Sequence, residues 1–318
     1  MAETVQELRA VYARTLNELA AENPDIVVLE ADLMKATGTG AFASAHPDRT
    51  INVGVAEATL VGVASGLSAE GKIPFAATFA CFASRRAFDQ FFLSANYARL
   101  NVKLVGTDPG VTAAFNGGTH MPLEDLALMR VIPGLRIVEP SDPVSLAAYL
   151  RLAAATRGCV YLRLQRKPAP AIYAPDEAFA WGEAKILRRA EGSGPADVLI
   201  IALGALMVGE ALKAADLLAA EGVRATVMDA LCLKPLDAGR ILEQARICPR
   251  IVTAENHQAS GGLGSAVAEI IADAGIAAHL ARVGVQDEFG EVGTQDWLQE
   301  RFGLTAARIA ERARALLA

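Results

Sequence analysis

Short β-rich runs alternate with longer helical patterns along most of this 318-residue chain, and this order restricts the folds open to it. In the first half, the expected strands are Ile26–Leu29, Ile51–Val53, Phe75–Thr78, Val102–Gly106, Arg136–Val138 and Val160–Leu164. The expected helices there are Val5–Glu22, Glu57–Ala69, Ser84–Leu100 and Asp142–Ala155. Strands joined through helices in this way form right-handed crossovers and therefore a mostly parallel sheet.

A proline-rich segment interrupts this alternation. Three prolines fall within Lys167–Asp176 without a hydrophobic period, which is typical of an extended linker. A second series of strands and helices begins at Val198 and ends with a helix that starts near Thr305. The sequence thus predicts an α/β protein with two tandem domains, each a mostly parallel sheet flanked by helices. We assign residues 1–170 to the first domain, 171–185 to the linker and 186–318 to the second domain.

The composition excludes several classes of protein. Apolar residues make up 53% and charged residues 21% of the chain, and the net charge of −6 does not suit a nucleic-acid partner. The longest apolar run, Val198 to Val208, is too short for a membrane span, and the amino terminus lacks a signal-peptide pattern. The four cysteines show no CxxC spacing, so neither a disulfide framework nor a metal site is expected. We expect a soluble, cytoplasmic protein.

Glu57 is the only charged residue between Arg49 and Glu70. It opens the helix expected over residues 57–69, whose body is small and apolar. Burying a lone carboxyl group in such a place is costly unless another group pairs with it. On local grounds, Glu57 is either a functional carboxylate or a surface residue that suits the positive end of the helix dipole.

Two phenylalanines, Phe79 and Phe82, follow one expected strand and precede Arg86. Ligands of open α/β sheets bind beyond the carboxyl ends of the strands, so these rings offer a flat face to an aromatic cofactor. Packing in the hydrophobic core is the alternative.

His120 lies in the loop Asn116-Gly-Gly-Thr-His120 and is one of four histidines. Paired glycines let the backbone approach a ligand closely, and a loop histidine suits acid–base chemistry or the polarisation of a carbonyl group. A surface or helix-capping histidine is the alternative.

Cations gather near the end of the strand expected over residues 160–164, in Arg163, Arg166 and Lys167. Arginine binds phosphate or sulfonate groups in a bidentate manner, although a solvated entry to the linker explains the cluster nearly as well. The common dinucleotide, P-loop, serine-hydrolase and zinc-protease motifs do not occur in the sequence. The segment Gly261-Gly-Leu-Gly264 is a weak phosphate-loop candidate and is better explained as a strand-to-helix turn.

These segments follow the order and spacing of the carboxyl-terminal portion of transketolases, over nearly the whole chain. The matching stretches are Ala31-Asp32-Leu33, Asn52-Val-Gly-Val-Ala-Glu57, Ala77-Thr-Phe79-Ala-Cys-Phe82-Ala-Ser-Arg-Arg86, Gly118-Thr-His120-Met-Pro-Leu-Glu124-Asp125, Val138-Glu-Pro140-Ser-Asp142, Glu255-Asn-His257 and Ser260-Gly-Gly-Leu-Gly264. The chain therefore resembles a transketolase pyrimidine-binding domain followed by the transketolase carboxyl-terminal domain.

The resemblance implies roles for single residues. Glu57 is expected to bind N1′ of the thiamine diphosphate aminopyrimidine, which favours the imino form whose 4′ nitrogen removes the thiazolium C2 proton. Phe82 is expected to stack on the pyrimidine ring, and His120 to contact substrate oxygens near the reacting carbon. Three further residues are candidates for cofactor binding. Phe79 is expected to support Phe82, and Asp32 resembles a family acid near the cofactor and the subunit contact. The third candidate is Arg86.

One part of the family pattern is missing. Transketolases hold the diphosphate and Mg²⁺ through a GDG…N motif on a preceding domain, and no GDG occurs in these 318 residues. The resemblance therefore implies the second subunit of a split transketolase, completed by an amino-terminal partner subunit with that motif in an α2β2 assembly. By itself, the chain is expected to bind thiamine diphosphate poorly and to show no ketol transfer.

Two positions depart from the family pattern. Asp108 stands where most transketolases carry a histidine, and Asn116 stands where they carry an aspartate. The family uses both positions to bind substrate hydroxyl groups. Arg166 aligns with a phosphate-binding arginine of the family, and Arg163 is a second candidate for an anionic substrate group. The expected substrate is an anionic sugar, phosphorylated or sulfonated, that need not be one of the usual pentose and hexose phosphates.

Two alternatives remain open. The β subunit of a 2-oxo acid dehydrogenase E1 and a deoxyxylulose-phosphate-synthase-like enzyme share the architecture and the glutamate, although the block Gly118–Asp125 favours a transketolase. A non-catalytic assembly or regulatory subunit is the second alternative. The presence of Glu57, Phe82 and His120 together argues against it.

Overall fold

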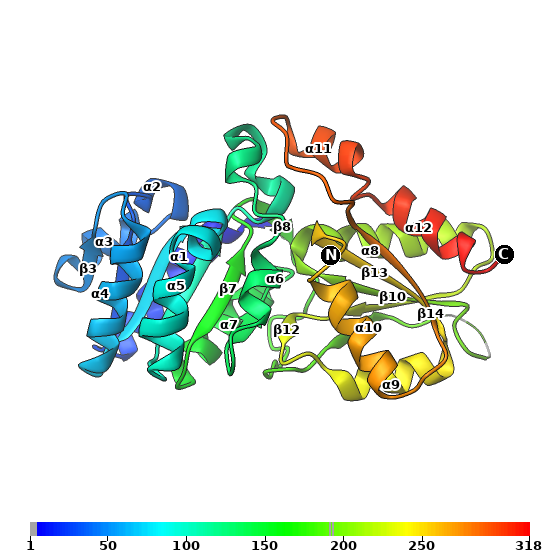
Figure 1. Ribbon diagram of the computed structural model, residues 1–318, viewed down its shortest axis with the longest axis horizontal. Helices are drawn as coiled ribbons and strands as arrows, with labels where there is room; N and C mark the ends of the chain where they lie inside the picture. Colours follow the sequence, from blue (N-terminus) through cyan, green and yellow to red (C-terminus); the bar gives the residue numbers. More distant parts are fainter. Residues whose placement is uncertain (1–4, 191, 193) are drawn as a thin grey trace.

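The computed structural model describes residues 5–190, 192 and 194–318, and it places two large sheets side by side along the long axis of the molecule (Figure 1). The first sheet has the strand order β12-β6-β7-β5-β4-β2-β3, and all its pairs are parallel except β12 with β6. Its strands are β2 (Ile26–Glu30), β3 (Thr50–Asn52), β4 (Ile73–Phe79), β5 (Lys103–Thr107), β6 (Arg136–Val138), β7 (Val160–Leu164) and β12 (Cys232–Lys234).

Helices cover both faces of this sheet, and the central strands β5 and β7 are buried at every position. Such burial is typical of parallel sheets, whose crossover helices leave neither face to solvent. The α-helices are α1 (Leu8–Glu22), α2 (Met34–Thr37), α3 (Gly40–Ala45), α4 (Glu57–Ala69), α5 (Phe88–Gln90), α6 (Asp125–Arg130) and α7 (Pro143–Ala155). Shorter 3₁₀ or wider π-type turns are η1 (Pro47–Arg49), η2 (Phe82–Arg86), η3 (Phe91–Tyr97), η4 (Gly110–Asn116) and η5 (Gly118–His120).

The second sheet has the strand order β14-β13-β10-β11-β9 and is parallel except for the pair of β9 with β11. Its strands are β9 (Lys185–Arg188), β10 (Val198–Leu203), β11 (Ala225–Asp229), β13 (Arg250–Gln258) and β14 (His279–Val285). The helices of this half are α8 (Gly204–Ala220), α9 (Ala238–Ile247), α10 (Leu263–Asp273), α11 (Gln295–Phe302) and α12 (Ala306–Ala315). The predicted fold class, two tandem α/β domains with mostly parallel sheets, is confirmed.

Several local predictions were wrong. The expected helix Val5–Glu22 starts at Leu8, because residues 5–7 form strand β1 (Val5–Glu7). This strand pairs antiparallel with β8 (Pro168–Pro170), so the proline-rich segment begins as part of a two-stranded ribbon. Ser84–Leu100 is not one regular α-helix, because wide turns replace most of it.

Strand β12 belongs to the second half of the chain by sequence, yet it extends the first sheet beside β6. The two halves are therefore joined by sheet pairing as well as by the linker. The boundaries at residues 170 and 185 stay a prediction; they fall at the end of β8 and at the start of β9. None of the helices in the described part of the chain has the length and apolar character that crossing a bilayer requires.

Candidate functional site

Three neighbouring strands bring the predicted site residues to one edge of the first sheet. Phe79 ends β4 and pairs in register with Thr107 of β5, which in turn pairs with Leu164 of β7. Asp108 directly follows Thr107, and Arg166 lies two residues beyond Leu164. The carboxyl ends of parallel strands meet at one edge, so Phe79, Asp108 and Arg166 are placed together.

Glu57 is the first residue of α4, and its side chain is buried, with 1% exposed. One carboxylate oxygen, Oε2, lies 2.6 Å from Nη1 of Arg86, and Thr78 Oγ1 donates to the other oxygen over 3.3 Å. A buried carboxylate needs such partners, because desolvation penalises the charged form. The position excludes the alternative in which Glu57 is a surface residue that only suits the helix dipole.

The rings of Phe79, Phe82 and His120 form one cluster beside this carboxylate. The His120 ring lies 5.1 Å from the Phe82 ring and 6.0 Å from the Phe79 ring, centroid to centroid, with an edge-on arrangement in both cases. The Arg86 guanidinium stands 4.2 Å from the centroid of Phe82. Both phenylalanines are only half-buried, so neither is a fully enclosed core residue.

The loop that carries His120 is held from two sides. Arg85 donates from Nη2 to the Thr119 carbonyl over 2.7 Å, and its Nε lies 3.2 Å from a carboxylate oxygen of Glu124. On the other side, the Gly290 carbonyl of the second half approaches Gly118 so closely that an added Cβ would stand 2.0 Å from it. Sequence reasoning missed Arg85; its place beside Arg86 at the end of β4 was the available signal.

Asp108 and Arg166 form an ion pair in which Arg166 Nε lies 2.6 Å from Asp108 Oδ2. Arg166 also donates to the Ala36 carbonyl over 3.1 Å, and its guanidinium lies 5.5 Å from the centroid of the Phe79 ring. Burial raises the pKa of Asp108, and the charge of Arg166 opposes that shift. The pair therefore adjoins the aromatic cluster through Phe79.

Asp32 and Asn116 are both exposed. The backbone N–H of Asp32 donates to Asn52 Oδ1 over 3.0 Å, and Asn116 ends η4. Within the described residues, neither side chain forms a hydrogen bond or ion pair with Glu57, Phe82 or His120.

The prediction that Arg163 binds substrate is wrong. Arg163 lies inside β7, its side chain is fully buried, and it donates to Asp125 and Glu139 over 2.8–2.9 Å and to the Asn256 carbonyl over 2.9 Å. Burial raises the pKa of Glu139 to about 7, against the opposing charge of Arg163. The charge of Arg163 and those of Asp125 and Glu139 thus compensate one another inside the protein. Arg163 is a structural residue.

The segment Gly261-Gly-Leu-Gly264 is a strand-to-helix turn. The carboxylate of Glu255 accepts from the backbone N–H groups of Leu263 and Gly264, over 2.7 and 2.8 Å, at the start of α10. An internal carboxylate thus occupies the place where a phosphate loop would hold its ligand.

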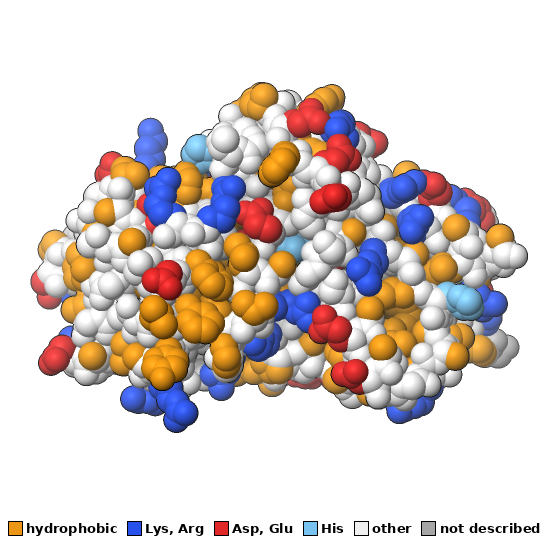
Figure 2. All heavy atoms as spheres, in the orientation of Figure 1, with side chains coloured by type: hydrophobic (Ala, Val, Ile, Leu, Met, Phe, Trp, Pro, Cys, Tyr) orange, Lys and Arg blue, Asp and Glu red, His pale blue; other side chains and the backbone are white. Residues whose placement is uncertain are grey.

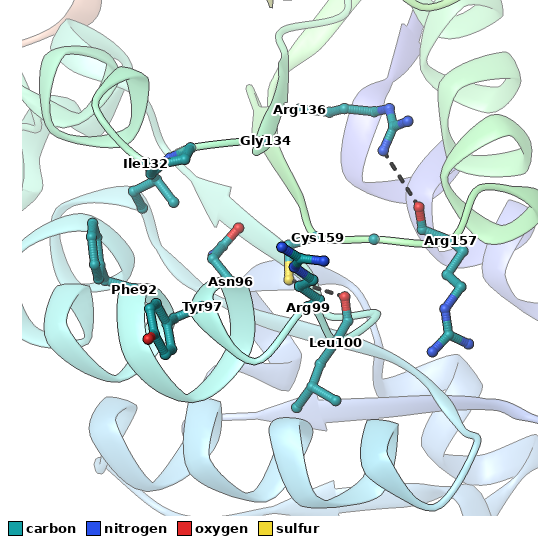
Figure 3. A pocket seen from close by; sticks show the side chains of 12 residues that line it. Phe92, Asn96, Tyr97, Arg99, Leu100, Ile132, Gly134, Arg136, Arg157 and Cys159 are labelled. Carbon is teal, nitrogen blue, oxygen red and sulfur yellow. Dashed lines mark hydrogen bonds between the residues drawn. The ribbon is translucent and has the colours of Figure 1, made fainter.

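A cavity lies at the opposite edge of the first sheet, where β6 and β7 begin (Figure 3). It measures about 820 Å³ and is lined in part by Tyr97, Arg99, Arg136 and Cys159. In Figure 3, Arg136 is turned towards the Arg157 carbonyl, 3.4 Å away. None of the predicted site residues lines this cavity, so it is separate from the cluster around Glu57.

Glu30 is a second buried carboxylate, at the end of β2 and two residues before Asp32. Its Oε1 accepts from the hydroxyl groups of Thr37 and Thr39, each over 2.7 Å. Burial raises the pKa of Glu30 to about 7, and the two hydroxyl groups only partly offset this rise.

Replacing Glu30 by glutamine is therefore expected to stabilise the protein at pH 8. The folded state binds the Glu30 proton more tightly than the unfolded chain, so this carboxyl favours folding below about pH 4.5 and loses that contribution as the pH rises to about 7. In thermal unfolding, we expect Glu30→Gln to raise the midpoint by a few degrees at pH 8 and to leave it nearly unchanged at pH 5. Equal shifts of the thermal midpoint at pH 5 and pH 8 would contradict the raised pKa assigned to Glu30.

Comparison with known proteins decides the family. The model of the transketolase pyrimidine-binding domain matches residues 5–170, and that of the transketolase carboxyl-terminal domain matches residues 182–309. The chain belongs to the transketolase family. The resemblance drawn from the sequence is thereby confirmed.

This transketolase-family chain matches two known proteins over almost their whole length. It is 49% identical over 306 residues, or 96% of this chain and 93% of the relative, to the 6-deoxy-6-sulfo-D-fructose transketolase subunit SqwH of Clostridium sp. (strain MSTE9). A solved structure described as a split gene transketolase, inactive beta4 tetramer, superposes with a TM-score of 0.89 at 45% identity, covering 98% of both chains. The 1-deoxy-D-xylulose-5-phosphate synthase of Heliobacterium modesticaldum is 38% identical over 96% of this chain, which spans only 46% of that enzyme.

Proposed function

We propose that this chain is the catalytic second subunit of a two-chain transketolase that transfers a glycolaldehyde unit from a ketose to an aldose with thiamine diphosphate. The observation that carries the proposal is the buried carboxylate of Glu57 beside the half-exposed ring of Phe82 and the ring of His120. These three side chains offer a hydrogen-bond acceptor, a stacking surface and a proton-transfer group within one cluster.

The residues fit the aminopyrimidine half of the cofactor. The Glu57 carboxylate is suited to accept a hydrogen bond from a protonated ring nitrogen, and Phe82 presents an aromatic face. Arg86 bonds only one oxygen of Glu57 at short range. When bound, thiamine diphosphate supplies the electron sink for cleaving the bond next to a ketone. We assign the diphosphate and Mg²⁺ to the partner; within the described residues, no cluster of three His, Cys, Asp or Glu side chains suits a metal ion.

The proposed reaction breaks the C2–C3 bond of the ketose and joins its two-carbon unit to the aldehyde carbon of the acceptor. The rest of the donor leaves as an aldose two carbons shorter, so no oxidant or reductant is consumed. His120 takes and returns the hydroxyl protons that move in these two steps. Asp108, Asn116 and Arg166 line the proposed sugar end of the site.

Exposed apolar side chains near the site favour the proposal that a partner subunit covers it. Phe289 is 97% exposed in the loop whose Gly290 packs on Gly118, and Phe115 is also exposed. Away from the site, Figure 2 shows further apolar side chains gathered over the segments between α4 and β7, which offer the partner a second area of contact. The relative from Clostridium is itself named a subunit. We propose an α2β2 assembly with a partner that carries a GDG…N motif, in the cytoplasm.

A substrate panel on the reconstituted pair tests the reaction type. With thiamine diphosphate and Mg²⁺, we expect a ketose and an aldose to exchange a two-carbon unit, detected as the new ketose by mass spectrometry. Pyruvate supplied with an electron acceptor, or with an aldose phosphate, should give no product. Turnover of pyruvate without ketol transfer would favour the 2-oxo acid dehydrogenase or deoxyxylulose-phosphate-synthase alternative.

A further inference from the structure

We propose that Asp108 tunes the charge specificity of the sugar end of this site, by penalising a doubly charged phosphate more than a singly charged sulfonate. The inference rests on the proposed function for its substrate class. It is carried by the ion pair of Asp108 with Arg166, next to the Phe79 ring of the cluster.

The pair changes what Arg166 can offer to an anion. Its Nε faces Asp108, and its Nη1 donates to the Ala36 carbonyl, which leaves Nη2 as the terminal nitrogen without an acceptor among the described residues. A free guanidinium binds phosphate through two parallel N–H groups. In this arrangement, the Nε–H and one Nη1–H of Arg166 are already engaged, which leaves the N–H groups at the Nη1/Nη2 end for an anion, and the charge of Arg166 is balanced at 2.6 Å by a carboxylate that is 2% exposed.

The surroundings nevertheless favour an anion. The charges of Lys167 and Arg9, in addition to Arg166, act on Asp108. Lys167 is influenced in turn by Asp108 and Asp296. The neighbourhood thus combines three cations with two carboxylates, those of Asp108 and Asp296, so its net charge is positive and an anion is attracted.

A second negative charge on the ligand meets the repulsion of Asp108. A phosphate monoester carries between about −1.5 and −2 charges at pH 7, whereas a sulfonate carries one. Two like charges about 6 Å apart in a partly buried site repel strongly enough for a difference of at least about tenfold in affinity. Asp108 therefore penalises the phosphate more than the sulfonate.

Asp108→Asn is the decisive variant, because it removes the charge and keeps the shape. Asp108 has a φ of 56°, a left-handed conformation that asparagine also adopts readily, so the backbone is expected to stay in place. Asp48→Asn is the matched control; Asp48 is an exposed carboxylate of the same half of the chain, in η1.

The test compares 6-deoxy-6-sulfo-D-fructose with D-fructose 6-phosphate as donors for the reconstituted pair. For Asp108→Asn, we expect the ratio of kcat/KM for phosphate over sulfonate to rise by at least about tenfold, while Asp48→Asn leaves the ratio unchanged. The ratio of Kd values for both sugars, measured by calorimetry, should shift likewise even if no turnover occurs.

Two results would overturn the inference. An unchanged ratio in Asp108→Asn would show that Asp108 does not discriminate charge. An equal loss for both sugars would show that Asp108 only positions Arg166. Absence of ketol transfer from either donor in the unaltered pair would instead contradict the proposed function, and the Kd ratio would still decide the role of Asp108.

Discussion

Glu57→Gln is expected to lower ketol transfer by the assembled two-chain enzyme by about a hundredfold to a thousandfold while the fold is kept. The carboxylate is buried and bonded to Arg86, whose guanidinium stands over the Phe82 ring, so its charge acts in a place with little solvent screening. Glutamine preserves the shape, and its single carbonyl oxygen can accept from Arg86 while its amide nitrogen donates to the Thr78 hydroxyl. It cannot stabilise a protonated ring nitrogen as an anion does.

The measurement is the rate of two-carbon transfer under saturating thiamine diphosphate, with circular dichroism and the thermal midpoint as checks of folding. Glu70→Gln is the matched control, because Glu70 is an exposed carboxylate at the other end of the same helix. It should retain the full rate. An unchanged rate in Glu57→Gln would favour the alternative of a non-catalytic assembly subunit.

Arg163→Met is expected to have the largest effect on stability, a loss of about 3–5 kcal/mol in the free energy of unfolding. The substitution leaves Asp125 and Glu139 inside the protein without their cation, and both are buried. Tyr161 donates to Asp125 over 2.8 Å and would compensate only part of the loss. The network also reaches the Asn256 carbonyl, so both halves of the chain depend on it.

Urea unfolding followed by circular dichroism measures this loss. Arg151→Met is the control, since Arg151 forms a surface ion pair with Glu18 and should cost no more than about 1 kcal/mol. If Arg163→Met lost as little as the control, the buried network would not be the stabilising element described above.

The regular elements could be predicted from the sequence because their hydrophobic patterns are strong. The helix Glu57–Ala69 and the strand Val160–Leu164 have the predicted bounds. Strand β12 was missed because a three-residue strand carries no period of its own, and its partner β6 is almost a hundred residues away. The pairing of β1 with β8 escaped for the same reason.

The residues of the site could be predicted from the sequence only in part. Local sequence left Glu57 ambiguous, and only the ordered family motifs gave it a role. Arg163 and Arg166 looked alike in the sequence, but a cation inside a strand that is buried on both faces must be neutralised by the protein itself. Arg166 lies beyond the end of β7 and stays partly exposed. The Asp108–Arg166 pair could not be predicted, because it depends on the register of β5 with β7.

A titration of this chain with its partner subunit tests the central proposal most directly. Ketol transfer is measured with thiamine diphosphate and Mg²⁺ for this chain alone, for a GDG…N partner alone and for mixtures of both. We expect no turnover from either chain alone and a rate that saturates at equal amounts of the two. Turnover by this chain alone, or none in any mixture, would contradict the account.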